Sequence, residues 1–280
     1  ATLRIATGPP GGVFRGLGAA LADVLTDRLP GTSLRLIHTD ASVDNLGLLR
    51  GGGAELGFAA VDTISDLVAR ADRPDLAAVA RLFDSWLQVL VLGSSPVTRF
   101  AQLDGEPVAA GAAGSGTRFG LTRLIETVGV KPALVTASQD DGAAALAAGR
   151  VAALVTFTGV PTPAVRRLAA GRSLRLLPLA AETYAMMNRF GSVYAAATLP
   201  STTYPGVAGA ATMTTPNLLL VRPDLSAPLV REITAALYAH RERLARHHPE
   251  AEQINIRTGS GTMPVRLHPG ARRYYRDVKP

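Results

Sequence analysis

The chain has 280 residues, 47% hydrophobic and 18% charged, a balance typical of a compact globular protein with room for two domains. It lacks cysteine, which excludes disulfides and thiolate metal sites, and no uncharged apolar run reaches the roughly 18 residues of a membrane span. The formal net charge is +7, but the arginines are scattered and only 5% of residues are aromatic, so we expect no nucleic-acid partner.

Apolar runs alternate with amphipathic segments along the chain, which indicates an α/β protein. In the first part we expect strands at residues 3–7, 34–38 and 55–60, and helices that carry Leu17–Leu25 and Val43–Leu49. Ser42 is expected to cap the second of these helices, and the glycines at 51–53 to end it.

A second α/β series follows the apolar run Trp86–Leu92, which we interpret as a buried strand. Further strands are expected near 107–110, 133–137, 152–157, 174–179 and 217–221, and helices after Ser115, around 138–141 and over 163–170. The last segment predicts one long helix, capped by Ser226 and reaching Leu244. Because no low-complexity linker separates the two series, we expect the chain to cross between domains on strands.

The loop Gly111–Arg118 lies between an apolar strand and a segment of helical spacing. A Gly/Ser/Thr loop that enters a helix presents free N–H groups and the positive end of the helix dipole, which favours an anion such as a carboxylate. Ser115 and Thr117 would add hydroxyl donors. The alternative is a tight turn in which Thr117 is only the N-cap of the helix.

Five loops follow the expected strands at their carboxyl ends, where open α/β sheets bind ligands. They are residues 8–14, 39–45, 60–62, 112–118 and 156–160. If the two series face each other, these loops line one cleft, as in a binding protein that closes around its ligand.

Six short motifs occur in a defined order along the chain. They are Ile5-Ala6-Thr7-Gly8-x-x-Gly11-Gly12, Thr39-x-Ala41-Ser42-x-x-Asn45-Leu46, Gly114-Ser115-Gly116-Thr117-Arg118, Thr158-Gly159-Val160-Pro161-Thr162-Pro163, Thr203-Tyr204-Pro205-Gly206 and Leu267-His268-Pro269-Gly270-Ala271-x-x-Tyr274-Tyr275. Together they closely resemble the TAXI family, the extracytoplasmic solute-binding subunits of TRAP transporters, over nearly the whole chain.

The resemblance implies a two-lobed periplasmic-binding-protein fold of the second type, hinged by crossing strands, with a ligand cleft between the lobes. We expect residues 1–91 and 214–280 to form the first lobe and residues 92–213 the second. The resemblance also implies capture of a small acidic metabolite, such as glutamate, glutamine or 2-oxoglutarate, for a TRAP-type membrane permease. We expect the protein to be a monomer. A sensory protein that partners a membrane sensor kinase is the alternative.

An extracytoplasmic location follows from the same resemblance, either in the periplasm or as a membrane-anchored lipoprotein. A removed leader would explain why the chain begins at Ala1, as would a deliberately shortened chain.

The first loop departs from the family pattern, in which a Gly-Gly-Thr-Gly-Gly-Thr-Tyr-Tyr type sequence is common. Here Pro9 and Pro10 remove two backbone donors, Phe14 lacks a tyrosine hydroxyl, and Arg15 adds a charge. Ala60-Val61-Asp62 also replaces a common Gln-x-Asp pattern. These changes leave the identity of the ligand open.

Arg15 and Arg118 are the candidates for pairing with a ligand carboxylate, the alternative being ordinary helix-surface charges. Asn45 is a ligand candidate by the family pattern, and Asp62 would hold a ligand ammonium or cap the next helix. The full set of expected ligand-binding residues is Gly12, Phe14, Arg15, Ser42, Asn45, Asp62, Ser115, Gly116, Thr117, Arg118, Thr158 and Gly159.

Catalysis in the same cleft is a further alternative, but the motifs of common enzymes are missing. Ala113 stands where a Gly-x-Ser-x-Gly elbow needs its first glycine, and no H-E-x-x-H or Gly-Lys-Ser/Thr motif occurs. His247 and His248 are expected at a helix end, where histidine meets the negative end of the dipole. We therefore expect neither an enzyme nor a metal or cofactor site.

Overall fold

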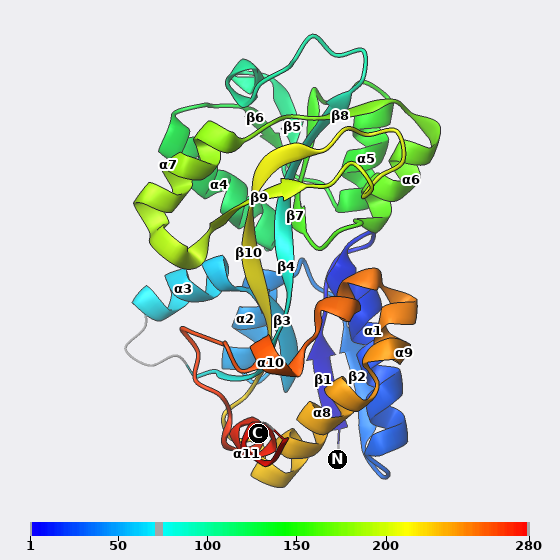
Figure 1. Ribbon diagram of the computed structural model, residues 1–280, viewed down its shortest axis with the longest axis vertical. Helices are drawn as coiled ribbons and strands as arrows, with labels where there is room; N and C mark the ends of the chain where they lie inside the picture. Colours follow the sequence, from blue (N-terminus) through cyan, green and yellow to red (C-terminus); the bar gives the residue numbers. More distant parts are fainter. Residues whose placement is uncertain (1, 71–74, 279–280) are drawn as a thin grey trace. The chain divides into compact units, whose positions relative to one another are not determined.

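The computed structural model describes residues 2–70 and 75–278 (Figure 1). The chain divides into two compact units. Unit 1 comprises Ala1–Gly8, Val13–Phe83 and Pro216–Pro280, and unit 2 comprises Pro9–Gly12 and Asp84–Thr215. After residue 13 the chain passes from one unit to the other twice, each time inside a strand. These strands are β4 (Ala77–Leu92) and β10 (Ala210–Val221). The boundaries expected from the sequence lie after residues 91 and 213.

Unit 1 is a sheet covered by helices on both faces. Its remaining elements are β1 (Thr2–Ala6), α1 (Val13–Arg28), β2 (Ser33–Ile37), α2 (Ser42–Arg50), β3 (Leu56–Ala60), α3 (Val61–Arg70), α8 (Ala227–Ala239), α9 (Arg241–His247), α10 (Ile256–Gly259) and α11 (Pro269–Val278). The strand order is β2-β1-β3-β10, with β1 parallel to β2 and β3, and β10 antiparallel to β3. One core cluster joins the sheet to α1, α8, α9 and α11, and a second joins it to α2 and α3.

Unit 2 repeats this layering around its own strands of the sheet. Its elements are β5 (Pro107–Ala109), α4 (Gly116–Val128), β6 (Ala133–Val135), α5 (Gln139–Ala147), β7 (Ala153–Thr158), α6 (Pro163–Gly171), β8 (Leu174–Leu176), α7 (Ala180–Phe190) and β9 (Ala195–Leu199). The strand order is β4-β7-β5-β6, while β8 pairs with β4 and β9 with β10. Helices α4 and α7 share one core cluster, and α5 and α6 share another (Figure 1).

Most expected elements are confirmed. Among the differences, β10 begins at Ala210, before the expected start at residue 217, and α11 has no counterpart among the expected helices. β4 begins at Ala77, well before the expected start at Trp86. The expected long C-terminal helix is interrupted at His240, so that α8 and α9 are separate helices. Helix α7 is not among the expected elements. Strand β9 is not among them either, because it reads Ala-Ala-Ala-Thr-Leu and offers no alternation of apolar and polar residues.

The expected caps have mixed outcomes. Ser226 caps α8 as expected, its Oγ accepting from the N–H of Leu229 at 3.4 Å. The cap assigned to Ser42 is wrong, because Ala41 holds that position with φ of 94° and Ser42 is already helical. The Ser42 Oγ accepts instead from the N–H of Ala60 at 3.1 Å, which ties α2 to the end of β3.

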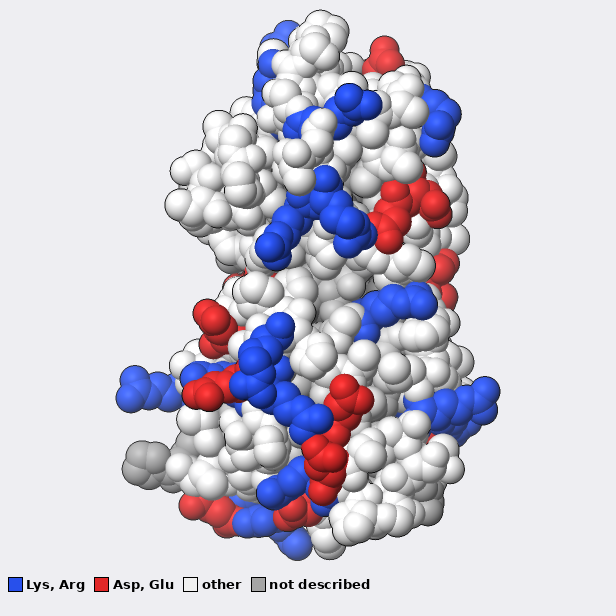
Figure 2. Space-filling view, turned by 90° about the vertical axis from the view of Figure 1, so that its right-hand side faces the viewer, with Lys and Arg blue, Asp and Glu red and all other residues white. Residues whose placement is uncertain are grey.

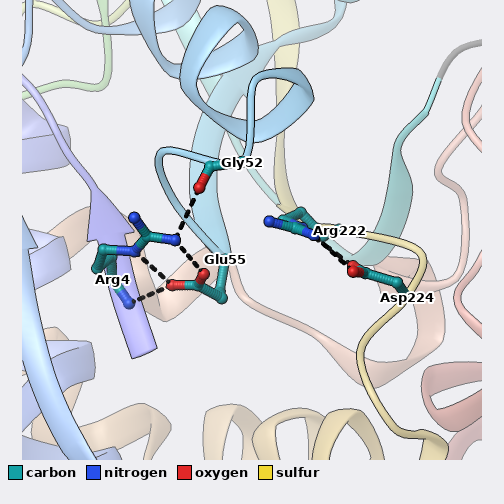
Figure 3. A network of polar contacts seen from close by, with 5 residues as sticks. All are labelled: Arg4, Gly52, Glu55, Arg222 and Asp224. Atoms are coloured by element: carbon teal, nitrogen blue, oxygen red, sulfur yellow. Dashed lines mark hydrogen bonds and ion pairs between the residues drawn. The ribbon is translucent and has the colours of Figure 1, made fainter. Parts of the chain in front are cut away.

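A polar network joins the start of β1 to the start of β3 in unit 1 (Figure 3). The Arg4 guanidinium donates to both carboxylate oxygens of Glu55, at 2.5 and 3.0 Å, and to the carbonyl of Gly52 at 2.7 Å. The hydrogen bonds from Arg4 lower the pKa of Glu55 from its usual 4.5. Arg222 forms a second pair with Asp224 at 2.5 Å.

No helix in the described ranges 2–70 and 75–278 is long and apolar enough to span a bilayer.

The Glu55 carboxylate makes the stability of unit 1 sensitive to acid. Since its pKa is lowered in the folded state, its contribution is complete above 4.5 and is lost as the pH falls through the lowered value. We expect urea unfolding between pH 6 and 3 to lose stability more steeply in the wild type than in Glu55→Gln. Asp224→Asn is the control, because the Asp224 side chain is 61% exposed and its pair with Arg222 is screened by solvent. Equal slopes for wild type and Glu55→Gln would contradict this.

Gly270 permits close contact between α11 and α8. A Cβ there would lie 2.2 Å from the carbonyl oxygen of Ala227 and 2.8 Å from the nitrogen of Arg231, both backbone atoms that cannot rotate away. We expect Gly270→Ala to lower the free energy of unfolding by about 1–3 kcal/mol, measured by urea denaturation. The control is Gly47→Ala in α2, where a Cβ meets no atom within 4 Å and alanine should stabilise the helix. A stabilised Gly270→Ala variant would refute the close contact.

Candidate functional site

The loop before α4 in unit 2 is folded back on the start of its helix. Gly111 has φ of +79°, and a Cβ there would lie 2.7 Å from the Ser115 Oγ and 2.9 Å from the Thr117 Cβ, so only glycine fits. Ser115 is the N-cap: its Oγ accepts from the N–H of Arg118 at 3.0 Å and donates to the carbonyl of Ala112 at 2.7 Å. The alternative in which Thr117 is the N-cap is therefore wrong.

Thr117 joins α4 to the neighbouring strand β7. Its Oγ1 accepts from the N–H of Phe157 at 2.9 Å, one residue before Thr158, which ends the strand. This bond brings together two expected parts of the site, the loop before α4 and the end of β7. The N–H groups of Gly116 and Thr117 belong to the first turn, where a helix offers no carbonyl partner.

The electrostatic character of this helix start is positive. The first turn of α4 contains no acidic residue, so nothing in it offsets the helix dipole. Arg118 donates from Nη2 to the Thr136 Oγ1 at 2.7 Å. Its Nε is buried and has no hydrogen-bond partner among the described residues. The start of α4 therefore has N–H groups that could donate hydrogen bonds to an anion.

Residues Pro9–Gly12, which the chain places between β1 and α1, pack with unit 2. Gly11 has φ of +79°, and a Cβ there would lie 2.5 Å from the Asp140 Oδ1 and 3.1 Å from the Ala164 Cβ. The N–H of Gly12 donates to the carbonyl of Pro9 at 3.2 Å. The loop thus lies at the starts of α5 and α6.

A buried polar network, not foreseen from the sequence, fixes the loop after β7. The Gln88 Nε2 donates to the Thr156 Oγ1 at 3.0 Å and to the Thr162 Oγ1 at 2.9 Å, and its Oε1 accepts from the Tyr204 hydroxyl at 2.6 Å. That hydroxyl also accepts from the N–H of Thr162 at 2.9 Å, and the Thr162 Oγ1 donates to the carbonyl of Gly159 at 2.9 Å. Gly159 is thereby held in place beside Thr158.

In unit 1, Asn45 is fully buried and its side chain bonds to its own unit. Its Nδ2 donates to the carbonyls of Thr7 at 2.7 Å and Phe58 at 2.8 Å, and its Oδ1 accepts from the Thr39 Oγ1 at 2.6 Å. These bonds tie the end of β1 and the middle of β3 to α2. Both donors of the amide are used, so the observed role of Asn45 is structural.

Three other expected residues of unit 1 differ in their surroundings. Asp62 is fully buried inside the first turn of α3, and its Oδ1 accepts from the N–H of Thr63 at 2.7 Å and from its Oγ1 at 3.2 Å. Phe14 stacks on Phe58, with ring centroids 5.4 Å apart, and belongs to the core. Arg15, in the first turn of α1, is partly exposed and pairs with no carboxylate of the described residues.

Charged side chains are mixed on the face shown in Figure 2, where Lys and Arg lie beside Asp and Glu and form no single basic stripe. Over residues 2–70 and 75–278, no three His, Asp or Glu side chains gather as metal ligands would.

Tyr204 is the residue on which the buried network of unit 2 depends. We expect Tyr204→Phe to destabilise the protein by about 1–3 kcal/mol, because the Gln88 Oε1 and the N–H of Thr162 would lose their partner in the interior. Chemical denaturation of the variant measures this. Tyr184→Phe is the control, since Tyr184 is 69% exposed and its loss of a hydroxyl should have no effect. A Tyr204→Phe variant as stable as the wild type would contradict the network.

The chain matches the sequence pattern of the NMT1-like family over residues 5–278. Its fold is similar to that of the periplasmic aliphatic sulphonate binding protein SsuA from Escherichia coli, with 20% identity over 100% of this chain and 84% of that chain and a TM-score of 0.53. It is also similar to the substrate binding protein of an amino acid ABC transporter (15% identity, 91% and 99% covered, TM-score 0.52). A third similar structure is the GluR0 ligand-binding core from Nostoc punctiforme in complex with L-glutamate, with 15% identity over 90% of this chain and 98% of that chain and a TM-score of 0.54.

At these identities the similarities concern the fold, and they confirm the expected two-lobed periplasmic-binding-protein fold of the second type. The match over residues 5–278 covers nearly the whole sequence, and the chain therefore belongs to the NMT1-like family.

Proposed function

We propose that this chain is an extracytoplasmic solute-binding protein that captures a small acidic solute for a membrane transporter. The observation that carries the proposal is the start of α4, where Arg118 has a buried Nε without a partner among the described residues. The first turn of this helix also has no acidic residue that would compete with a bound anion. The family and the fold support the same function.

The chemistry of the site suits a carboxylate or a sulfonate. Oxygen atoms of the solute would accept hydrogen bonds from Arg118 and from the N–H groups of Gly116 and Thr117. The hydroxyls of Ser115 and Thr117 shape this site through their internal bonds, and Thr158 and Gly159 lie at the neighbouring strand end. Arg15, in unit 1, stays a predicted ligand residue.

The resemblance to the TAXI family supports a TRAP-type permease as the partner, and glutamate, glutamine or a dicarboxylate as the solute. The similar structures widen this range, because their names include an aliphatic sulphonate binder and a protein bound to L-glutamate. All these solutes share an anionic head group, which is the feature that the α4 start would recognise. That the loops of both units act on one solute stays a prediction.

Arg118→Gln tests the proposal. We expect wild-type protein to bind at least one of L-glutamate, L-glutamine, 2-oxoglutarate, succinate, malate and ethanesulfonate in calorimetry. The variant should bind that solute about ten- to a hundredfold more weakly, because hydrogen bonds to charged groups contribute about 1.5–3 kcal/mol.

Arg172→Gln is the matched control. Arg172 is exposed in the same unit and makes no ion pair within the described part of the chain, so its removal changes the net charge equally without touching α4. Equal weakening in both variants would mean that net charge alone attracts the solute. Unchanged affinity in Arg118→Gln would remove the α4 start from the binding site.

A further inference from the structure

Gln139 is a buried polar residue of unit 2 whose hydrogen bonding is incomplete. It is the first residue of α5 and only 8% of its surface is exposed. Its Oε1 is buried and has no partner within residues 2–70 and 75–278. Buried acceptors without partners are rare in native proteins and costly, so this one requires an explanation.

The capping of α5 does not supply that explanation. The cap is Ser138, whose Oγ accepts from the N–H of Asp141 at 3.1 Å and donates to the Asp141 Oδ2 at 2.7 Å. The helix start is complete without the amide of Gln139. The residue beside that amide is Gly12, where a Cβ would lie 3.8 Å from Nε2, and its backbone N–H already donates to Pro9.

The start of α5 differs in charge from the start of α4. Its first turn carries Asp140 and Asp141, and Asp140 pairs with Arg167. These carboxylates and the Gln139 oxygen are acceptors, so this helix start favours a group that donates hydrogen bonds or is positively charged. The start of α4 instead favours an anion.

The two helix starts follow neighbouring parallel strands and are bonded to each other. β5 pairs with β6, the N–H of Ala137 donates to the carbonyl of Gly111 at 3.3 Å, and the Arg118 Nη2 donates to the Thr136 Oγ1 at 2.7 Å. At the carboxyl ends of these two strands, N–H donors of one loop therefore lie near a buried acceptor of the next that has no partner among the described residues.

We propose that Gln139 is a specificity-determining residue whose Oε1 accepts a hydrogen bond from an amino group of the solute. The inference rests on the proposed function, because it assigns the anionic head of the same solute to the α4 start. Residues Pro9–Gly12 lie beside the amide, so the amino group reaches the Oε1 only if this loop moves. The protein then selects amino-bearing acids over acids of the same size that lack this donor.

Gln139→Met tests the proposal, since methionine keeps the length of the side chain and removes the amide. Without solute, the variant should melt about 2–4 °C higher than the wild type, because a buried acceptor without a partner has been removed. Calorimetry would compare L-glutamate with 2-oxoglutarate, and taurine with ethanesulfonate. Wild type should prefer the amino-bearing member of the pair that binds by about tenfold or more, and the variant should bind both members about equally.

Thr183→Val is the matched control. The Thr183 Oγ1 is also buried without a partner in the described structure, but it belongs to α7, which packs in the other core cluster of unit 2 (Figure 1). This variant should also melt higher, yet it should keep the wild-type preference.

The outcomes separate this inference from the proposed function. If wild type binds an acid but Gln139→Met keeps the wild-type preference, Gln139 does not select the solute and the binding function stands. A Gln139→Met variant that melts lower than wild type would show that the oxygen is used within the fold, which overturns the inference alone. If wild type binds none of these acids, the proposed function and the inference fail together.

Discussion

The requirement that buried polar groups find hydrogen-bond partners governs the loops at the carboxyl ends of the strands. Ser115, Thr117, Asn45 and Gln88 are all buried, and each uses its side chain to hold backbone or a neighbouring side chain of its own unit. These bonds cost little, because they replace bonds to water with bonds of similar strength in a drier setting. They also fix the loops, so that the backbone N–H groups of the α4 start keep one direction. A preformed loop loses less conformational freedom when a solute binds.

Seven buried side-chain nitrogen and oxygen atoms of the described residues lack partners, and two of them lie close in the topology of unit 2. The Arg118 Nε and the Gln139 Oε1 lack partners in the described structure, and they follow adjacent strands. The Arg118 Nε is a donor of a charged group. The Gln139 Oε1 is an uncharged acceptor, and the next two residues in the sequence, Asp140 and Asp141, carry carboxylates. Departures from the rule of satisfied polar groups are expected at functional sites, where the missing partner is the ligand.

The sequence allowed the fold class and most element positions to be predicted, because the periodicity of apolar residues follows the local structure. It failed where tertiary contacts decide. His240 ends α8 without proline or glycine. Strand β9, Ala-Ala-Ala-Thr-Leu, pairs with β10 although its pattern does not favour a strand. Among the site residues, local spacing identified the loop Gly111–Arg118. Local spacing could not show that Ser115 caps α4 while the Thr117 hydroxyl accepts from the N–H of Phe157, because the second bond depends on the neighbouring strand. Gln88 and Tyr204 are 116 residues apart, so their bond leaves no local signal.

Nitrogen-15 NMR of the Arg118 Nε–H and of the Gly116 and Thr117 amides, during titration with the acid that binds, tests the central claim most directly. We expect these three resonances to shift together and to saturate at the same solute concentration, because one anionic group accepts from all of them. A solute that binds and shifts other resonances while these three stay unchanged would contradict the proposed binding site.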